Sequence, residues 1–206
     1  MNLETLKLLE AKFLSVYPGG FQHPELVKIG KKHKMPQMIA LAKERFDTGC
    51  FAKESQVLES MIQLVSRSSM VSVFEKPRFR DYVRSLSQEH RSVLVSGLRE
   101  LLHGKEEVGF QMILDVLDDG KLAKWTLLSV WQAYYMPTKG VFIKPTTVKN
   151  VIQTLELDDL VYHSRPDFQF YRKYRAAINH MKKEVDKSFT DSNAAFSGFL
   201  MMAMSL

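Results

Sequence analysis

Apolar residues recur at spacings of three and four along almost the whole chain, and this period constrains the fold more than any other feature. In the first window Leu6, Leu9 and Phe13 fall on one stripe of a helix over residues 3–16. No segment shows the sustained alternation typical of a half-buried strand. The pattern therefore predicts an all-α fold, a compact multi-helix bundle of about ten helices with short connections.

Proline, glycine and capping residues set the expected helix boundaries. Pro24 suits the first turn of a helix, Ser87 an N-cap, and Gly104 the position just past a helix end. Thr146 or Thr147 is expected to cap a later helix. The expected helices cover residues 3–16, 24–32, 36–46, 53–66, 77–86, 87–103, 106–117, 122–135, 146–155 and 166–185, with a last helix after residue 190.

Helical spacing also assigns residues to the core, with Leu26, Val27 and Ile29 expected to be the apolar positions of the second helix. The chain of 206 residues is expected to form a single helical domain, with a candidate subdomain boundary near Gly120. Its one cysteine, Cys50, cannot form an intrachain disulfide. The N-terminal segment is amphipathic and lacks a secretory leader, so we expect a cytoplasmic protein.

The net charge of +6 is concentrated in the C-terminal part of the chain. Residues 1–120 carry a formal charge of +1, and residues 121–206 carry +5. A basic skew favours contact with nucleic acid, with an acidic protein or with an anionic surface.

Motifs for common enzyme chemistries are missing or misplaced. The tripeptide Asp47-Thr48-Gly49 matches the aspartic-protease motif, but it follows a helical segment and fits a helix end. No phosphate-binding glycine motif occurs, and the six histidines show no short metal-ligand spacing. We therefore expect no cofactor, no metal site and no catalytic residue, and a binding protein is favoured over an enzyme.

Basic and aromatic residues alternate in the segment from Arg67 to Arg84. Arg78 and Arg80 lie among Phe74, Phe79 and Tyr82. Arginine beside exposed aromatic rings can bind phosphates and stack on bases. An amphipathic helix with core aromatics and solvated arginines would produce the same pattern.

The segment TTVKNVIQTLELDDLVY, residues 146–162, resembles the recognition helix and following turn of bacterial winged-helix DNA-binding domains. The resemblance implies base or phosphate contacts from Thr146, Thr147, Lys149, Asn150 and Gln153. The chain departs from that family on both sides. VFIKP stands where a preceding helix is expected, and Pro166 with helical periodicity stands where the wing is expected.

The runs FIKPTTVK, RPDFQFYRKYR and NAAFSGFLMM resemble a bacterial family of helical proteins without an assigned activity. This resemblance implies a helical fold and supplies no site residues.

Three functions remain open. The first is nucleic-acid contact through the basic C-terminal half. The second is a protein–protein adaptor or a homodimer that uses the Met-rich C-terminal helix, which is too short to span a bilayer. The third is an enzyme or a small-molecule binder for an anionic ligand. Its pocket would be lined by Lys144, Lys149, Tyr162, Arg165, Arg172 and Arg175. The candidate binding residues are Arg78, Arg80, Lys144, Thr146, Thr147, Lys149, Arg165 and Arg172, and the irregular link 139–165 is the first place to look.

Overall fold

The computed structural model describes residues 1–206 and contains only helices, turns and irregular connections, which confirms the all-α prediction. Eleven α-helices are joined by short segments. Their bounds are α1 Leu3–Val16, α2 Pro24–His33, α3 Met35–Arg45, α4 Glu54–Arg67, α5 Glu75–Ser85, α6 Gln88–His103, α7 Glu106–Asp119, α8 Trp125–Tyr135, α9 Pro145–Thr154, α10 Phe168–Met181 and α11 Asn193–Ala203. Three short 3-10 helices cover Gly20–Gln22, Thr48–Ala52 and Lys187–Phe189.

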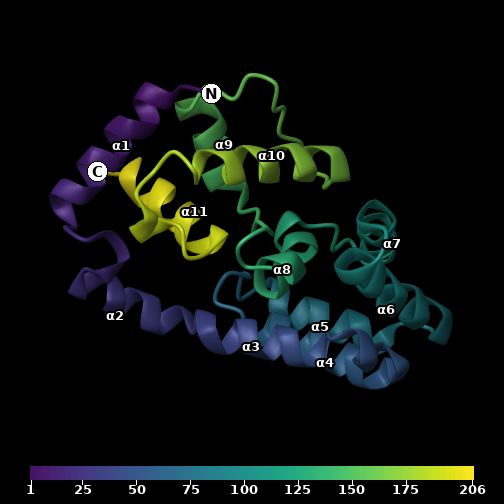
Figure 1. The fold of residues 1–206 in the computed structure, drawn as a ribbon. Coiled ribbons are helices and arrows are strands. Elements are labelled where there is room, and N and C mark those ends of the chain that lie inside the picture. The colour runs from purple at the N-terminus through teal and green to yellow at the C-terminus, as the bar shows by residue number, and fades with distance from the viewer.

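Helix α8 lies at the centre of the molecule (Figure 1). Nine of its 11 residues are buried, including both tryptophans of the chain. Helices α3 to α7 lie on one side of it, and α1, α9, α10 and α11 lie on the other (Figure 1). One hydrophobic cluster of 53 buried residues runs through both groups, so a single core connects the two ends of the sequence.

The α6–α7 pair forms the most extensive helix–helix contact in the molecule. Two glycines allow the close approach. A Cβ atom on Gly109 would lie 2.1 Å from the backbone nitrogen of Leu101 and 2.5 Å from the carbonyl oxygen of Gly97. Only a residue without a side chain fits at this crossing.

Several expected boundaries and core positions are wrong. Helix α9 begins at Pro145 after Lys144, so neither Thr146 nor Thr147 is its N-cap. Helix α10 ends at Met181 and not near residue 185. Val27 and Ile29 are exposed, because α2 buries only Leu26 against its neighbours.

No helix in the structure combines the length and the apolar character that crossing a bilayer requires.

Candidate functional site

The N-terminal end of α8 contacts the start of α5 and the irregular segment 155–167. Thr126 Oγ1 donates a hydrogen bond to Glu75 Oε2 at 2.8 Å, which joins α8 to the start of α5. The indole Nε1 of Trp125 donates to the carbonyl oxygen of His163 at 2.8 Å. We call this region, defined by Glu75, Trp125, Thr126, Tyr162 and His163, the α8 junction.

Lys149 of α9 extends over the α8 junction. Its Nζ lies 5.0 Å from the centroid of the Tyr162 ring. That ring in turn lies 6.4 Å from the Trp125 ring and 5.8 Å from the Phe170 ring. In such a cation–π contact the ammonium group stays in water, and its attraction to the ring fixes the position of the lysine side chain. Burial also raises the pKa of the Tyr162 phenol, so the ring stays neutral.

Beside the junction, the residues before Glu75 expose apolar side chains to solvent. Phe74 is 80% exposed and Val73 is 69% exposed. The other aromatic residues of this basic segment are not available in the same way. Phe79 is fully buried, and Tyr82 donates its hydroxyl proton to the carbonyl oxygen of Val116. Of the three aromatic residues predicted to stack on bases, only Phe74 therefore has an exposed ring with no partner in the protein.

Seven of the eight predicted binding residues are exposed: Arg78, Arg80, Lys144, Thr146, Lys149, Arg165 and Arg172. Thr147 is buried, because it lies on the inner face of α9 beside Val148. It cannot contact a surface ligand, and this part of the prediction is wrong for a structural reason.

The exposed cations of this set differ in how far neighbouring groups neutralise them. Arg80 Nε lies 2.7 Å from Asp81 Oδ1, and Arg165 Nη2 lies 2.8 Å from Asp118 Oδ2. These hydrogen bonds raise the pKa of both guanidinium groups. Arg172 donates to the amide oxygen of Gln169. Arg78 and Lys144 have no hydrogen-bonding or ionic partner for their side chains, so their charges face solvent.

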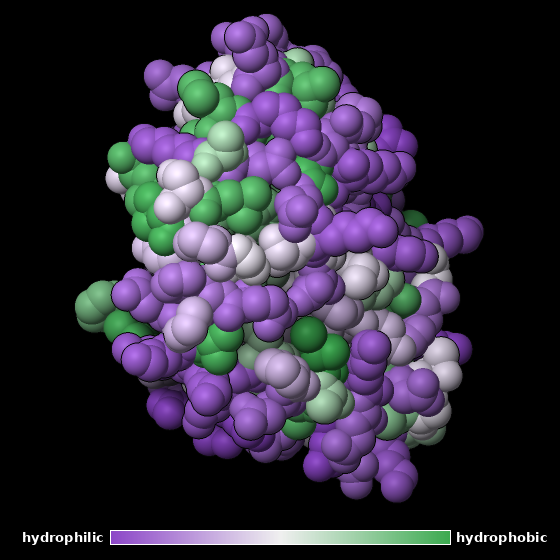
Figure 2. Space-filling model, turned by 60° about the vertical axis from the view of Figure 1, so that its left-hand side comes forward, coloured by the Kyte–Doolittle hydropathy of each residue, from purple (hydrophilic) through white to green (hydrophobic).

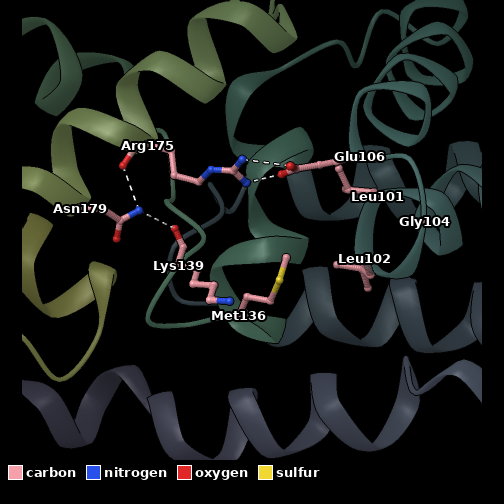
Figure 3. Close-up of a pocket in the computed structure, with 8 residues that line it drawn as sticks. All are labelled: Leu101, Leu102, Gly104, Glu106, Met136, Lys139, Arg175 and Asn179. Carbon is pink, nitrogen blue, oxygen red and sulfur yellow. Dashed lines mark hydrogen bonds and ion pairs between the residues drawn. The ribbon is translucent and has the colours of Figure 1, made fainter.

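A cavity lies at the opposite end of α8 (Figure 3). Its volume is about 390 Å³, and it lies between the α6–α7 corner, the end of α8 and α10. The lining residues are Leu101, Leu102, Gly104, Glu106, Met136, Lys139, Arg175 and Asn179. Of the six residues that the sequence suggested for an anion pocket, only Arg175 lines this cavity.

The charged groups of the cavity form an ion pair. Two nitrogens of Arg175 bind the two carboxylate oxygens of Glu106, with Nη2 2.9 Å from Oε2. Gln132 of α8 donates a further hydrogen bond to Glu106 Oε1 at 2.5 Å. Burial by itself would raise the pKa of Glu106, but the hydrogen bonds from Arg175 and Gln132 outweigh burial and lower it.

Two features of the charge distribution do not show in the charge totals of residues 1–120 and 121–206. The first is a cluster of exposed cations on α2 and its end, formed by Lys28, Lys31, Lys32 and Lys34, none of which makes an ion pair. The second is Lys139, which lines the cavity and whose ammonium group makes no hydrogen bond and no ion pair. The lysine run of α2 is visible in the sequence, whereas only the fold brings Lys139 to the same cavity as Arg175.

Metal-binding residues do not cluster: no group of three or more His, Cys, Asp or Glu side chains is arranged to hold a metal ion. Asp47 is the N-cap of a 3-10 helix whose first two residues are Thr48 and Gly49, and Asp47 Oδ2 accepts the backbone N–H of Gly49. This geometry is that of a helix cap and not of a paired catalytic carboxylate.

A scan against models of protein families, a search of curated proteins and a search of solved structures each match nothing to this chain.

Proposed function

We propose that this protein is a non-catalytic cytoplasmic binding protein that contacts nucleic acid through the surface around the α8 junction. The observation that carries the proposal is the position of Phe74. It is the most exposed large apolar side chain in the molecule, and it precedes a helix that presents the unpaired Arg78. The free thiol of Cys50 favours a reducing compartment.

Both ends of the proposed surface carry cations beside aromatic rings. Arg78 and Lys76 follow Phe74 on α5, while Lys149 covers Tyr162 on the α9 side. A cationic surface follows a phosphate backbone, and an exposed ring stacks on any unpaired base. The combination favours single-stranded nucleic acid over duplex, because an aromatic side chain can stack only on a base that is not already stacked within a double helix.

Fluorescence anisotropy with a labelled single-stranded oligonucleotide and its duplex, at several salt concentrations, tests the proposal. We expect binding that weakens steeply with salt. Phe74→Ala should weaken single-strand binding about tenfold. Arg78→Gln should lower the salt slope by about one. Lys12→Gln removes an exposed lysine of α1 and should change neither quantity. Absence of binding at micromolar protein in low salt, or normal binding by both Phe74→Ala and Arg78→Gln, would refute the proposal.

A homodimer is the second candidate. Leu8 on α1 is 68% exposed, and Met201 on α11 is also exposed, on two helices that pack together. Figure 2 shows that hydrophobic residues form several groups between hydrophilic ones on this side of the molecule. Light scattering on the wild type and on Leu8→Glu decides, because a dimer through this surface should dissociate in the variant. Truncation of α11 is a poor test, since Phe196, Phe199 and Leu200 are part of the core.

A further inference from the structure

The cavity at the C-terminal end of α8 combines a cationic side with an apolar floor. Figure 3 shows the Arg175–Glu106 pair across the cavity, with Lys139 and Met136 below it. Leu101 and Leu102 contribute apolar surface from the end of α6. A volume of about 390 Å³ lies within the usual range for small-molecule sites.

Arg175 has binding capacity left after it pairs with Glu106. A guanidinium group carries five N–H donors, and Glu106 takes two of them. The Cζ atom of Arg175 also lies 5.2 Å from the centroid of the Tyr171 ring. The ring and the carboxylate hold the guanidinium plane in one orientation, so little conformational freedom is left to lose when a ligand binds.

Lys139 is positioned through its backbone and not through its side chain. Its carbonyl oxygen accepts hydrogen bonds from Asn179 Nδ2 at 3.1 Å and from Asn193 Nδ2 at 2.9 Å. Lys139 is one of the residues that line the cavity, and its ammonium group makes no hydrogen bond and no ion pair. An unpartnered cation and a fixed guanidinium on residues that line the same cavity can together bind an anionic group.

The charges and the floor define the class of ligand. Lys139 and Arg175 contribute two positive charges and Glu106 one negative charge, so one negative charge on a ligand balances the site. We propose that the cavity binds a small organic monocarboxylate. Its carboxylate lies between Lys139 and the free N–H groups of Arg175, and its apolar tail lies against Leu101, Leu102 and Met136.

This site is independent of the proposed nucleic-acid surface. Met136 directly follows α8, whereas the α8 junction is formed by the first residues of that helix. A helix of 11 residues separates them by about 16 Å along its axis. Loss of one activity therefore leaves the other measurable.

Isothermal titration of the full chain at pH 7 tests the proposal with acetate, butanoate, hexanoate, 1-hexanol and inorganic phosphate. We expect affinity to rise about fourfold for each added methylene, until the tail covers the apolar floor. Hexanol should bind at least about tenfold more weakly than hexanoate, because it lacks the charge-assisted hydrogen bonds. Phosphate should bind more weakly than hexanoate, because it has no tail and its second charge faces Glu106.

Two lysine variants locate the site. Lys139→Met keeps an unbranched side chain and the backbone contacts while it removes the charge, so it should fold normally and bind hexanoate at least about tenfold more weakly. Lys173→Met removes an exposed, unpaired lysine of α10 that does not line the cavity, and it should bind like the wild type. The proposal is overturned if wild-type protein does not bind hexanoate at millimolar concentration, if phosphate binds more tightly, or if Lys139→Met binds hexanoate normally.

Discussion

The α6–α7 pair and the irregular segment 136–144 lie next to each other, yet different kinds of hydrogen bond stabilise their backbones. In the helix pair, the hydrogen bonds are local and the packing joins helices that are neighbours in sequence. In the segment 136–144, several backbone groups bind side chains far away in sequence. Gly140 O accepts from Asn193 at 3.1 Å, and the backbone nitrogen of Ile143 donates to Ser129 Oγ at 2.9 Å.

The segment also depends on the last two helices. Lys182 Nζ donates to the carbonyl oxygen of Thr138 at 2.8 Å and to Asn193 Oδ1 at 2.7 Å. The Tyr171 hydroxyl accepts the N–H of Val141. Burial raises the pKa of this phenol, so it stays protonated. Buried backbone without secondary structure needs such partners, because unsatisfied polar groups are costly. The cavity therefore lies between the α6–α7 pair, which is held by contacts local in sequence, and the segment 136–144, which is held by side chains from other parts of the chain.

The largest effect is expected from Gly109→Ala in the helix pair. The new methyl group would overlap the backbone of Leu101 and Gly97, and backbone atoms cannot move aside as a flexible side chain can. We expect a loss of about 3 kcal/mol in the free energy of unfolding, measured by urea denaturation. A loss below about 1 kcal/mol would show that the two helices can separate without penalty.

Asn193→Ala tests the contacts that hold the segment 136–144. It removes the donors to Lys139 O and Gly140 O and one partner of Lys182, all at a fully buried residue. We expect a loss of about 2–3 kcal/mol and faster hydrogen exchange across residues 138–141. Asn150→Ala is the matched control, because this exposed residue of α9 makes no side-chain hydrogen bond, and its effect should stay within about 0.5 kcal/mol. Equal effects in the two variants would contradict the role of Asn193.

Glu106→Gln tests the ion pair that joins α7 to Arg175 of α10. Because the folded-state pKa of Glu106 is lowered, its contribution is present above the ordinary pKa of a glutamate and is lost as pH falls through the folded-state pKa. We expect the variant to be less stable by about 1 kcal/mol at pH 7, a value reduced for partial exposure of the pair.

This difference should shrink as pH falls below about 4. Urea denaturation at several pH values measures it. Glu107→Gln, which removes an exposed carboxylate next in sequence, should show a smaller effect with little change across this range. A constant gap between Glu106→Gln and wild type at all pH values would contradict the assignment.

Gly30→Ala should give the smallest effect, and in the opposite direction. No atom lies within 4 Å of a Cβ added to this exposed helical glycine. Alanine has the higher helix propensity, so we expect stabilisation by about 0.5–1 kcal/mol, measured as a higher urea midpoint. Destabilisation would contradict the open environment of Gly30, because it would mean that the added methyl group meets another part of the protein.

The surface positions could be predicted only in part. Exposure of Arg78 and Lys149 follows from the helical period, which leaves polar residues outside the apolar stripe. The burial of Thr147 could not be predicted, because a threonine at a helix start is equally typical of a cap. Val27 and Ile29 were wrongly assigned to the core, since α2 has no neighbour to cover them. Periodicity identifies a face of a helix, but it does not show whether another element packs against that face.

The all-α class and most helix positions follow from local sequence, because the apolar period, Ser87, Gly104 and the prolines each act on backbone within a few residues of themselves. The pairing of charged and polar groups, in contrast, depends on how the helices pack in three dimensions. Glu106 and Arg175 are 69 residues apart, and Asn193 binds carbonyl oxygens more than 50 residues away. Their pairing results from the burial of α8 between the two groups of helices, and no local pattern specifies it.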